Sequence, residues 1–179
     1  IATRWAQDGI LNGSGIATTI MSNLGLERFL NQRGITMERT QVGDRYVVEH
    51  MRKSGFNLGG EQSGHIIMSD FSTTGDGLIA GLQFLAEIVR SNRDSKDLAR
   101  IFEPIPQLLK NAAYKKGSDP LSKPNVLKAI KAAELQLGVR GRLLIRKSGT
   151  EPLIRVMAES EDEEKMTRAV DSVVAEIIA

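Results

Sequence analysis

The chain of 179 residues contains no cysteine, which excludes a disulfide framework, a thiolate nucleophile and any metal site built on cysteine. Aromatic residues make up only 4% of it, too few for the stacking platforms that bind single-stranded nucleic acid. No apolar run approaches the roughly 20 residues of a membrane span, and no signal peptide is visible. We therefore expect a cytoplasmic protein that binds neither nucleic acid nor a membrane.

The remaining composition is that of an ordinary folded protein. Apolar residues make up 41% and charged residues 26% of the chain, so disorder is not indicated. The length allows one large domain or two small ones, with a core in either case. The formal net charge of +2 suits a small anionic substrate without requiring one.

Strand and helix patterns alternate along the first half of the chain. Strands are expected over 15–21, 35–40 and 65–68, and helices over about 26–34, over 44–52 and after Asp76. This alternation predicts a βαβ-type layered α/β domain over residues 1–93, with the chain entering at Ile1 near the end of a strand. The polar stretch 91–96 is interpreted as a linker and hinge.

The second half predicts a different, smaller domain over residues 94–179. A strand near 108–114 and a loop over 115–123 precede a helix that begins at Pro124 and ends before Gly138. A hairpin and a last helix follow, and Ser160 and Glu163 have the spacing of a capping box at that helix. We expect an antiparallel sheet covered by two helices.

The hairpin loop is the first candidate site. Two apolar strands flank the residues 147–152, Lys-Ser-Gly-Thr-Glu-Pro, with Arg146 and Arg155 at the ends. A lysine, two hydroxyls and two arginines suit a phosphate, because charge-assisted hydrogen bonds are about twice as strong as neutral ones. The alternative is an ordinary polar turn with solvated arginines, since Ser, Gly and Thr are common turn residues.

The second candidate site is the glycine-rich segment 59–65, Gly-Gly-Glu-Gln-Ser-Gly-His. If the backbone is extended there, Glu61, Ser63 and His65 point the same way. A carboxylate accepts from two neighbouring hydroxyls at once, and an imidazole moves protons near neutral pH, so the set suits a polyhydroxylated ligand. The alternative is a plain connection into the next strand.

Other polar residues have simple structural roles available. Asp44 precedes a helix and is a candidate N-cap, and Asp76 with Thr73 and Thr74 fits a turn and helix start. His50 is expected on the surface of a helix, and Arg45 as a solvated helix residue.

Taken together, these motifs resemble the α-D-phosphohexomutases, and specifically the bacterial phosphoglucosamine mutase branch of that family. The resemblance rests on segments 60–65 and 73–77 and on Arg-Lys-Ser-Gly-Thr-Glu-Pro at 146–152. Met-Ser-Asn-Leu-Gly-Leu-Glu at 21–27 and Val-Gly-Asp-Arg-Tyr-Val-Val-Glu at 42–49 extend it. It covers essentially the whole chain and identifies it as the third and fourth domains of a longer enzyme.

The resemblance implies a role for each matching residue. Glu61 and Ser63 would hold sugar hydroxyls, with His65 assisting proton transfer, and the loop of Gly43 and Asp44 would approach the sugar. The distal phosphate would be held by residues of the second loop, namely Arg146, Ser148, Gly149, Thr150 and Arg155. The substrate would be a phosphorylated hexosamine, interconverted between its 6- and 1-phosphates through a bisphosphate in the supply of cell-wall precursors.

The family's phosphoserine loop, Thr-Ala-Ser-His-Asn-Pro, and its metal loop, Asp-Gly-Asp-Ala-Asp-Arg, do not occur in this chain. We therefore expect no metal site here, Mg²⁺ bound by a domain outside the chain, and the N-terminal domains of the same enzyme as partners. Two alternatives of function remain: a non-catalytic sugar-phosphate-binding module, and a phosphoglucomutase or phosphomannomutase of the same superfamily. A nucleic-acid-binding domain rests only on an isoelectric point near 9.0, without a clustered basic face.

Overall fold

A computed structural model describes residues 1–179 and divides them into two compact units, Ile1–Pro104 and Ile105–Ala179. The expected boundary after residue 93 therefore lies eleven residues too early. The expected linker also contains the start of a short helix, α5 (Ser95–Ala99). The segment after it stays with the first unit because the Phe102 and Phe29 rings lie 6.3 Å apart.

The first unit is an α/β domain built on a four-stranded sheet in the order β2-β1-β3-β4. Strand β1 is parallel to both β2 and β3, whereas β4 is antiparallel to β3. The strands are β1 (Gly15–Thr19), β2 (Thr36–Thr40), β3 (Leu58–Gly60) and β4 (Ile66–Met68). The longer helices are α1 (Ala2–Gln7), α2 (Leu24–Asn31), α3 (Asp44–Ser54) and α4 (Gly77–Ser91), and a 3₁₀ turn spans Asn12–Ser14.

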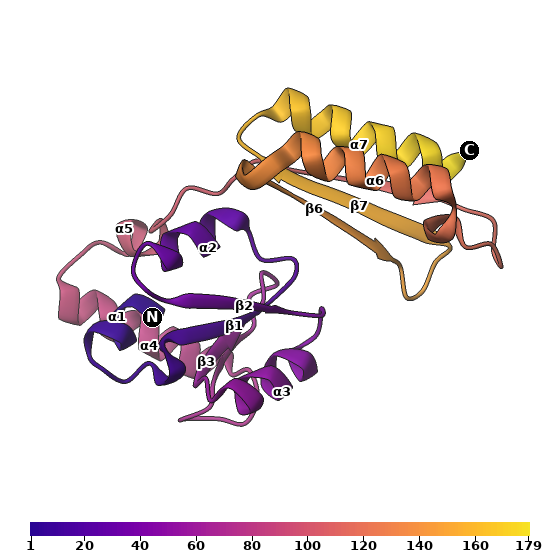
Figure 1. Ribbon diagram of the computed structural model, residues 1–179. Coiled ribbons are helices and arrows are strands. Elements are labelled where there is room, and N and C mark those ends of the chain that lie inside the picture. Colours follow the sequence, from indigo (N-terminus) through magenta and orange to yellow (C-terminus); the bar gives the residue numbers. More distant parts are fainter. The chain divides into compact units, whose positions relative to one another are not determined.

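Apolar side chains are buried on both faces of this sheet, as the alternation along β1 requires. Ile16 joins a cluster with Trp5, Leu30 and Leu58, whereas its neighbour Ala17 joins a second cluster around α3. The layered α/β fold expected from the sequence is confirmed (Figure 1). Two local expectations were wrong: the chain begins in helix α1, and the residue that caps α3 is Gly43 while Asp44 is its first helical residue.

The second unit is a three-stranded antiparallel sheet in the order β5-β7-β6, with helices on one face. Its strands are β5 (Gln107–Ala113), β6 (Gly141–Lys147) and β7 (Leu153–Ser160), and its helices are α6 (Pro124–Leu137) and α7 (Glu163–Ile178). Short 3₁₀ turns span Pro120–Ser122 and Gly138–Arg140. Helices α6 and α7 lie side by side over the sheet, which confirms the expected architecture (Figure 1).

The core of the second unit explains which strand residues face the helices. Ile154, Val156 and Ala158 on β7 are buried with Val170 and Val173 of α7. The last helix is capped two residues later than expected, because the Asp162 side chain accepts a hydrogen bond from the Lys165 amide at 3.0 Å. Ser160 instead accepts from the Asp162 amide at 3.1 Å.

Candidate functional site

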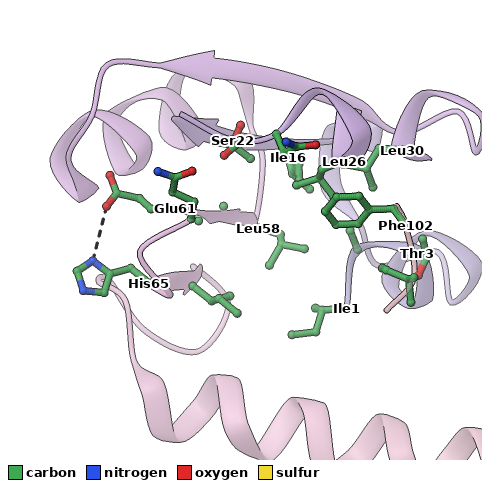
Figure 2. Close-up of a pocket in the computed structure, with 18 of the residues that line it drawn as sticks. Ile1, Thr3, Ile16, Ser22, Leu26, Leu30, Leu58, Glu61, His65 and Phe102 are labelled. Carbon is green, nitrogen blue, oxygen red and sulfur yellow. Dashed lines mark ion pairs between the residues drawn. The ribbon is translucent and has the colours of Figure 1, made fainter. Parts of the chain in front are cut away.

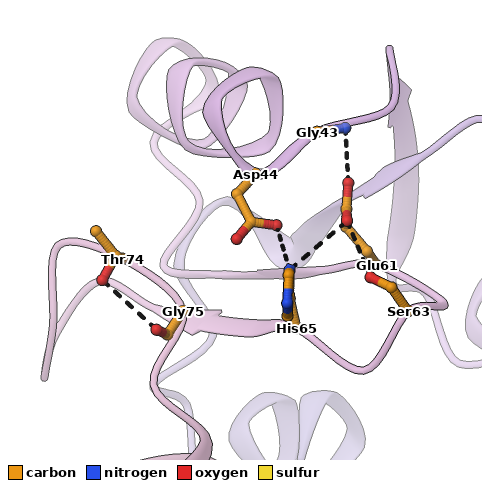
Figure 3. Close-up of polar contacts among 7 residues, drawn as sticks. All are labelled: Gly43, Asp44, Glu61, Ser63, His65, Thr74 and Gly75. Atoms are coloured by element: carbon orange, nitrogen blue, oxygen red, sulfur yellow. Dashed lines mark hydrogen bonds and ion pairs between the residues drawn. The ribbon is translucent and has the colours of Figure 1, made fainter. Parts of the chain in front are cut away.

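The segment that carries Glu61 is a tight connection between β3 and β4, not an extended strand. The Glu61 amide donates to the His65 carbonyl at 2.9 Å, and the Gly64 amide donates to the Glu61 carbonyl at 3.1 Å. The turn still gathers the predicted side chains, because Ser63 Oγ donates to Glu61 Oε2 at 3.0 Å. His65 Nδ1 lies 3.8 Å from the same carboxylate oxygen (Figure 3).

The start of α3 holds this turn through two adjacent residues. The Gly43 amide donates to Glu61 Oε1 at 2.7 Å, and Asp44 Oδ1 lies 2.9 Å from His65 Nδ1 (Figure 3). Gly43 has a φ of 128°, a conformation that favours glycine. The structure therefore brings five predicted residues into one cluster: Gly43, Asp44, Glu61, Ser63 and His65.

Burial differs sharply within this cluster, which we call the Glu61 cluster. The Glu61 side chain is 9% exposed, whereas the His65 side chain is 59% exposed. A carboxylate has about four acceptor positions, and two protein donors occupy only part of that capacity. Glu61 is thus a fixed, largely desolvated acceptor, and His65 is an accessible group beside it.

A cavity of about 420 Å³ adjoins the Glu61 cluster. Glu61 and His65 lie at one end of it, and its wall includes Ile16, Leu26 and Leu58 (Figure 2). This lining is largely apolar and suits packing by other apolar groups better than a polyhydroxylated ligand. The Glu61 carboxylate and the His65 imidazole form a polar edge at one end of the cavity.

Asp44, Glu61 and His65 also offer three ligand atoms within 4.8 Å of one another. Both Glu61 oxygens already accept hydrogen bonds, and His65 Nδ1 is already paired with Asp44. Mg²⁺ requires near-octahedral oxygen coordination, and this set does not fit it.

The second candidate site lies on the β6–β7 hairpin. Strand pairing places Arg146 directly opposite Arg155. Leu143 and Ile145 on β6, and Ile154 and Val156 on β7, pack into the helix-facing core. Because side chains alternate along a strand, the two arginines lie on the opposite, helix-free face.

This paired arrangement carries an electrostatic cost. Like charges directly opposite on neighbouring strands are destabilising, and neither guanidinium has an acidic partner in this structure. Partial burial, with a smaller contribution from the Arg155 charge, lowers the pKa of Arg146. A bound anion between the two guanidinium groups would offset their repulsion.

The loop between these strands presents the other predicted phosphate-site residues. The Ser148 amide donates to the Leu153 carbonyl at 2.8 Å, which closes the hairpin, and Gly149 and Thr150 are exposed at the tip. Lys147 does not join this set. Its Nζ lies 2.7 Å from Asp119 Oδ1, and this hydrogen bond raises the pKa of Lys147 and lowers that of Asp119.

Asp119 is a residue that sequence reasoning missed, because only folding brings the 114–119 segment beside the hairpin loop. The Tyr114 amide donates to the Pro152 carbonyl at 3.1 Å, so the segment is attached at both ends.

The structural role predicted for Asp76 is confirmed. Asp76 caps α4 by accepting from the Leu78 and Ile79 amides at 2.9 and 3.0 Å.

The two remaining polar helix residues, His50 and Arg45, lie on α3 and pair with acidic residues outside the Glu61 cluster. His50 pairs through Nε2 with Glu38, and Ser54 Oγ lies 3.2 Å from the same nitrogen. Arg45 donates to Glu49 at 3.1 Å and is 82% exposed, as expected for a solvated helix residue.

Comparison with known proteins gives two family matches in chain order. Residues 1–105 match the model of phosphoglucomutase/phosphomannomutase, alpha/beta/alpha domain III, and residues 109–176 match that of phosphoglucomutase/phosphomannomutase, C-terminal domain. The chain belongs to the phosphoglucomutase/phosphomannomutase family. The two matched regions correspond to the two compact units.

Relatives and solved structures of this family agree. The chain is 65% identical to a phosphoglucosamine mutase of Ruegeria sp. (strain TM1040) over its whole length, and 66% identical to that of Ruegeria pomeroyi over 97% of it. It spans about 40% of the length of these relatives. The fold resembles Aspergillus fumigatus N-acetylphosphoglucosamine mutase, with a TM-score of 0.78 at 17% identity, over 99% of this chain and 40% of that one.

A phosphoglucomutase/phosphomannomutase family protein from Burkholderia thailandensis gives a TM-score of 0.72 at 19% identity, over 98% of this chain and 39% of that one. None of the helices in the structure combines the length and apolar character that crossing a membrane would demand.

Proposed function

We propose that this chain is the substrate-binding portion of a phosphoglucosamine mutase, which interconverts glucosamine 6-phosphate and glucosamine 1-phosphate. The observation that carries the proposal is the pairing of Arg146 with Arg155 beside a hydroxyl-bearing loop, in a chain that also contains the Glu61 cluster. One site suits a phosphate and the other suits sugar hydroxyls. The 65% identity to a protein named phosphoglucosamine mutase supports the amino sugar over glucose or mannose.

The Glu61 cluster supplies the proposed sugar contacts. Glu61 is held by the Gly43 amide and by Ser63, so its remaining lone pairs point in fixed directions and accept from neighbouring sugar hydroxyls. Such bonds to a charged acceptor contribute about 1.5–3 kcal/mol each. His65 lies beside the Glu61 carboxylate, with Nδ1 3.8 Å from Oε2. It is therefore close enough to a hydroxyl bound by Glu61 to receive or return its proton.

The hairpin supplies the proposed contacts to the phosphate that does not react. Arg146 and Arg155 provide fixed positive charge, and Ser148, Gly149 and Thr150 provide hydroxyl and backbone donors. Phosphoryl transfer depends mainly on positioning and charge stabilisation. Holding the sugar and its distal phosphate rigidly is therefore itself a contribution to catalysis.

The chemistry is proposed to run through a hexosamine bisphosphate, as the resemblance to phosphohexomutases implies. A related Aspergillus fumigatus structure contains glucose 1,6-bisphosphate, and another contains GlcNAc-6P and magnesium. When bound, Mg²⁺ supplies charge neutralisation for the transferring phosphoryl group. We assign it, with the phosphoserine, to the N-terminal domains of the longer enzyme, because neither the phosphoserine loop nor the metal loop of the family occurs in this chain.

The test is a mutase assay on two proteins, the full-length enzyme and the chain 1–179 alone. The full-length protein is expected to convert glucosamine 6-phosphate to glucosamine 1-phosphate, with much lower activity on glucose and mannose phosphates. The chain alone is expected to give no product above a control without enzyme, since it lacks both the phosphoserine and metal loops. Product formed by the chain alone, or a preference for glucose 6-phosphate in the full-length protein, would overturn the proposal.

A further inference from the structure

The two ring nitrogens of His65 have different surroundings. Nδ1 lies 2.9 Å from Asp44 Oδ1, within hydrogen-bonding distance. Nε2 has no hydrogen-bond partner in the protein, and the side chain is 59% exposed. The imidazole is therefore anchored through one nitrogen and open at the other.

Glu61 does not share this anchoring role. Its Oε2 is 3.8 Å from His65 Nδ1, beyond hydrogen-bonding distance. Each Glu61 oxygen instead accepts from another donor, Oε1 from the Gly43 amide and Oε2 from Ser63. Asp44 and Glu61 are thus adjacent carboxylates with separate tasks, one for the ring and one for ligand hydroxyls.

We propose that Asp44 is a positioning residue that sets the tautomer of His65. A carboxylate only accepts hydrogen bonds, so Nδ1 must carry the proton when the ring is neutral. Nε2 then carries the lone pair and faces the ligand as a proton acceptor. This inference rests on the proposed function, since it assigns the direction in which the Glu61 cluster moves a proton.

The proton transfer that this tautomer permits is balanced. As the sugar hydroxyl attacks the phosphoserine of the longer enzyme, its O–H bond breaks and a new O–P bond forms. The P–O bond to the serine breaks with its electron pair remaining on the serine oxygen, and the hydroxyl proton moves to His65 Nε2. Asp44 Oδ1 and Glu61 Oε2 are the carboxylate oxygens nearest to His65 Nδ1, at 2.9 and 3.8 Å.

The start of α3 makes Asp44 well suited to this task. The Tyr46 amide donates to the Gly43 carbonyl at 2.9 Å, so Asp44 is in the first turn of a helix and not in a mobile loop. The helix thus holds the Asp44 backbone, and its carboxylate oxygen lies 2.9 Å from His65 Nδ1.

The chain contains a built-in control, because it has only two histidines. His50 pairs with Glu38 through Nε2, so the same reasoning predicts the opposite tautomer there. Long-range ¹H–¹⁵N correlation spectra of the ¹⁵N-labelled chain 1–179, recorded above the titration of both rings, report which nitrogen is protonated. We expect the proton on Nδ1 of His65 and on Nε2 of His50.

Two matched variants test the cause. Asp44→Asn replaces an acceptor by a group that can donate to Nδ1, so the His65 proton is expected to move to Nε2 while His50 is unchanged. Glu38→Gln should affect only His50. A His65 ring protonated on Nε2 in the unmodified chain, or one that keeps its tautomer in Asp44→Asn, would overturn the assignment.

Kinetics of the full-length enzyme test whether the tautomer matters. Asp44→Asn is expected to lower kcat at least tenfold with a much smaller change in KM, because ground-state binding by Glu61 persists; Glu38→Gln should match wild type. A tautomer that flips while kcat stays within twofold would refute the catalytic part of the proposal. Absence of mutase activity in the unmodified enzyme would count against the proposed function, and the spectra would still decide the Asp44–His65 assignment.

Discussion

Arg155→Ala in the full-length enzyme tests whether the hairpin arginines hold a substrate phosphate. Arg155 lies on β7, beyond the turn, directly opposite Arg146. Nothing in the geometry of the turn requires an arginine there, because the hairpin is closed by the Ser148 amide and the Leu153 carbonyl. The substitution removes one guanidinium and leaves the backbone bonds of the loop intact.

The structure predicts opposite effects on activity and on stability. One or two charge-assisted hydrogen bonds of about 1.5–3 kcal/mol each are lost in the transition state, which lowers kcat/KM by about tenfold to about ten-thousandfold, at tenfold per 1.4 kcal/mol. The ligand-free protein should be as stable as wild type or slightly more stable. The reason is that two like charges directly opposite each other cost about 0.2–1 kcal/mol.

The assay pairs kcat/KM for glucosamine 6-phosphate with thermal unfolding, each with and without inorganic phosphate. In wild type, phosphate should raise Tm, and in Arg155→Ala this rise should be reduced or lost. Arg168→Ala is the matched control, since Arg168 is 56% exposed on α7 and pairs with Glu164. Kinetics of Arg155→Ala within twofold of wild type would return the hairpin to an ordinary polar turn.

Three further substitutions probe other parts of the chain. Glu61→Ala in the full-length enzyme should lower kcat/KM by at least a hundredfold without unfolding the protein, since several hydrogen bonds of about 1.5–3 kcal/mol are lost; unchanged kinetics, or unfolding seen by circular dichroism, would contradict the assignment. Gly59→Ala should destabilise the first unit by about 1–3 kcal/mol in urea unfolding, because a Cβ there would lie 2.6 Å from Met51 Sδ; a neutral result would contradict this packing. The hydrogen bond from Arg4 lowers the pKa of Glu87 in the folded protein. This ion pair therefore stabilises the fold above the pKa of Glu87 in the unfolded chain, near 4.5, and the stabilisation is lost as the pH falls through the lower pKa of the folded state. Glu87→Gln should therefore lower Tm at pH 7 but converge with wild type towards pH 3, and a difference that persists in acid would rule out this ion pair as the cause.

Local patterns in the sequence were enough to predict most of the helices and strands. Helix α6 begins at Pro124 and ends before Gly138, and α3 ends before Gly55, as their capping residues indicate. The layered unit followed by the antiparallel unit also follows from the order of these elements. These features depend on neighbouring residues, whose spacing is visible in the sequence itself.

The contacts that organise the candidate sites depend on residues far apart in the chain. Asp44 meets His65 across 21 positions, and Asp119 meets Lys147 across 28. No periodicity signals such a pairing, so the sequence predicted a cap or a sugar-proximal position for Asp44 without its contact to His65, and it predicted the anion site for Lys147. The domain boundary was misplaced for the same reason, because packing against Phe29 keeps Phe102 in the first unit.

The turn that carries Glu61 is closed by the protein's own hydrogen bonds. Its backbone is fixed by the bonds from the Glu61 amide to His65 and from the Gly64 amide to Glu61. Ordering the backbone of one residue costs about 1–2 kcal/mol of conformational entropy, and here that loss occurs during folding. When a sugar binds at this turn, the sugar loses conformational entropy but the backbone of the turn loses little more. Less of the free energy of each new hydrogen bond is therefore offset by ordering the protein.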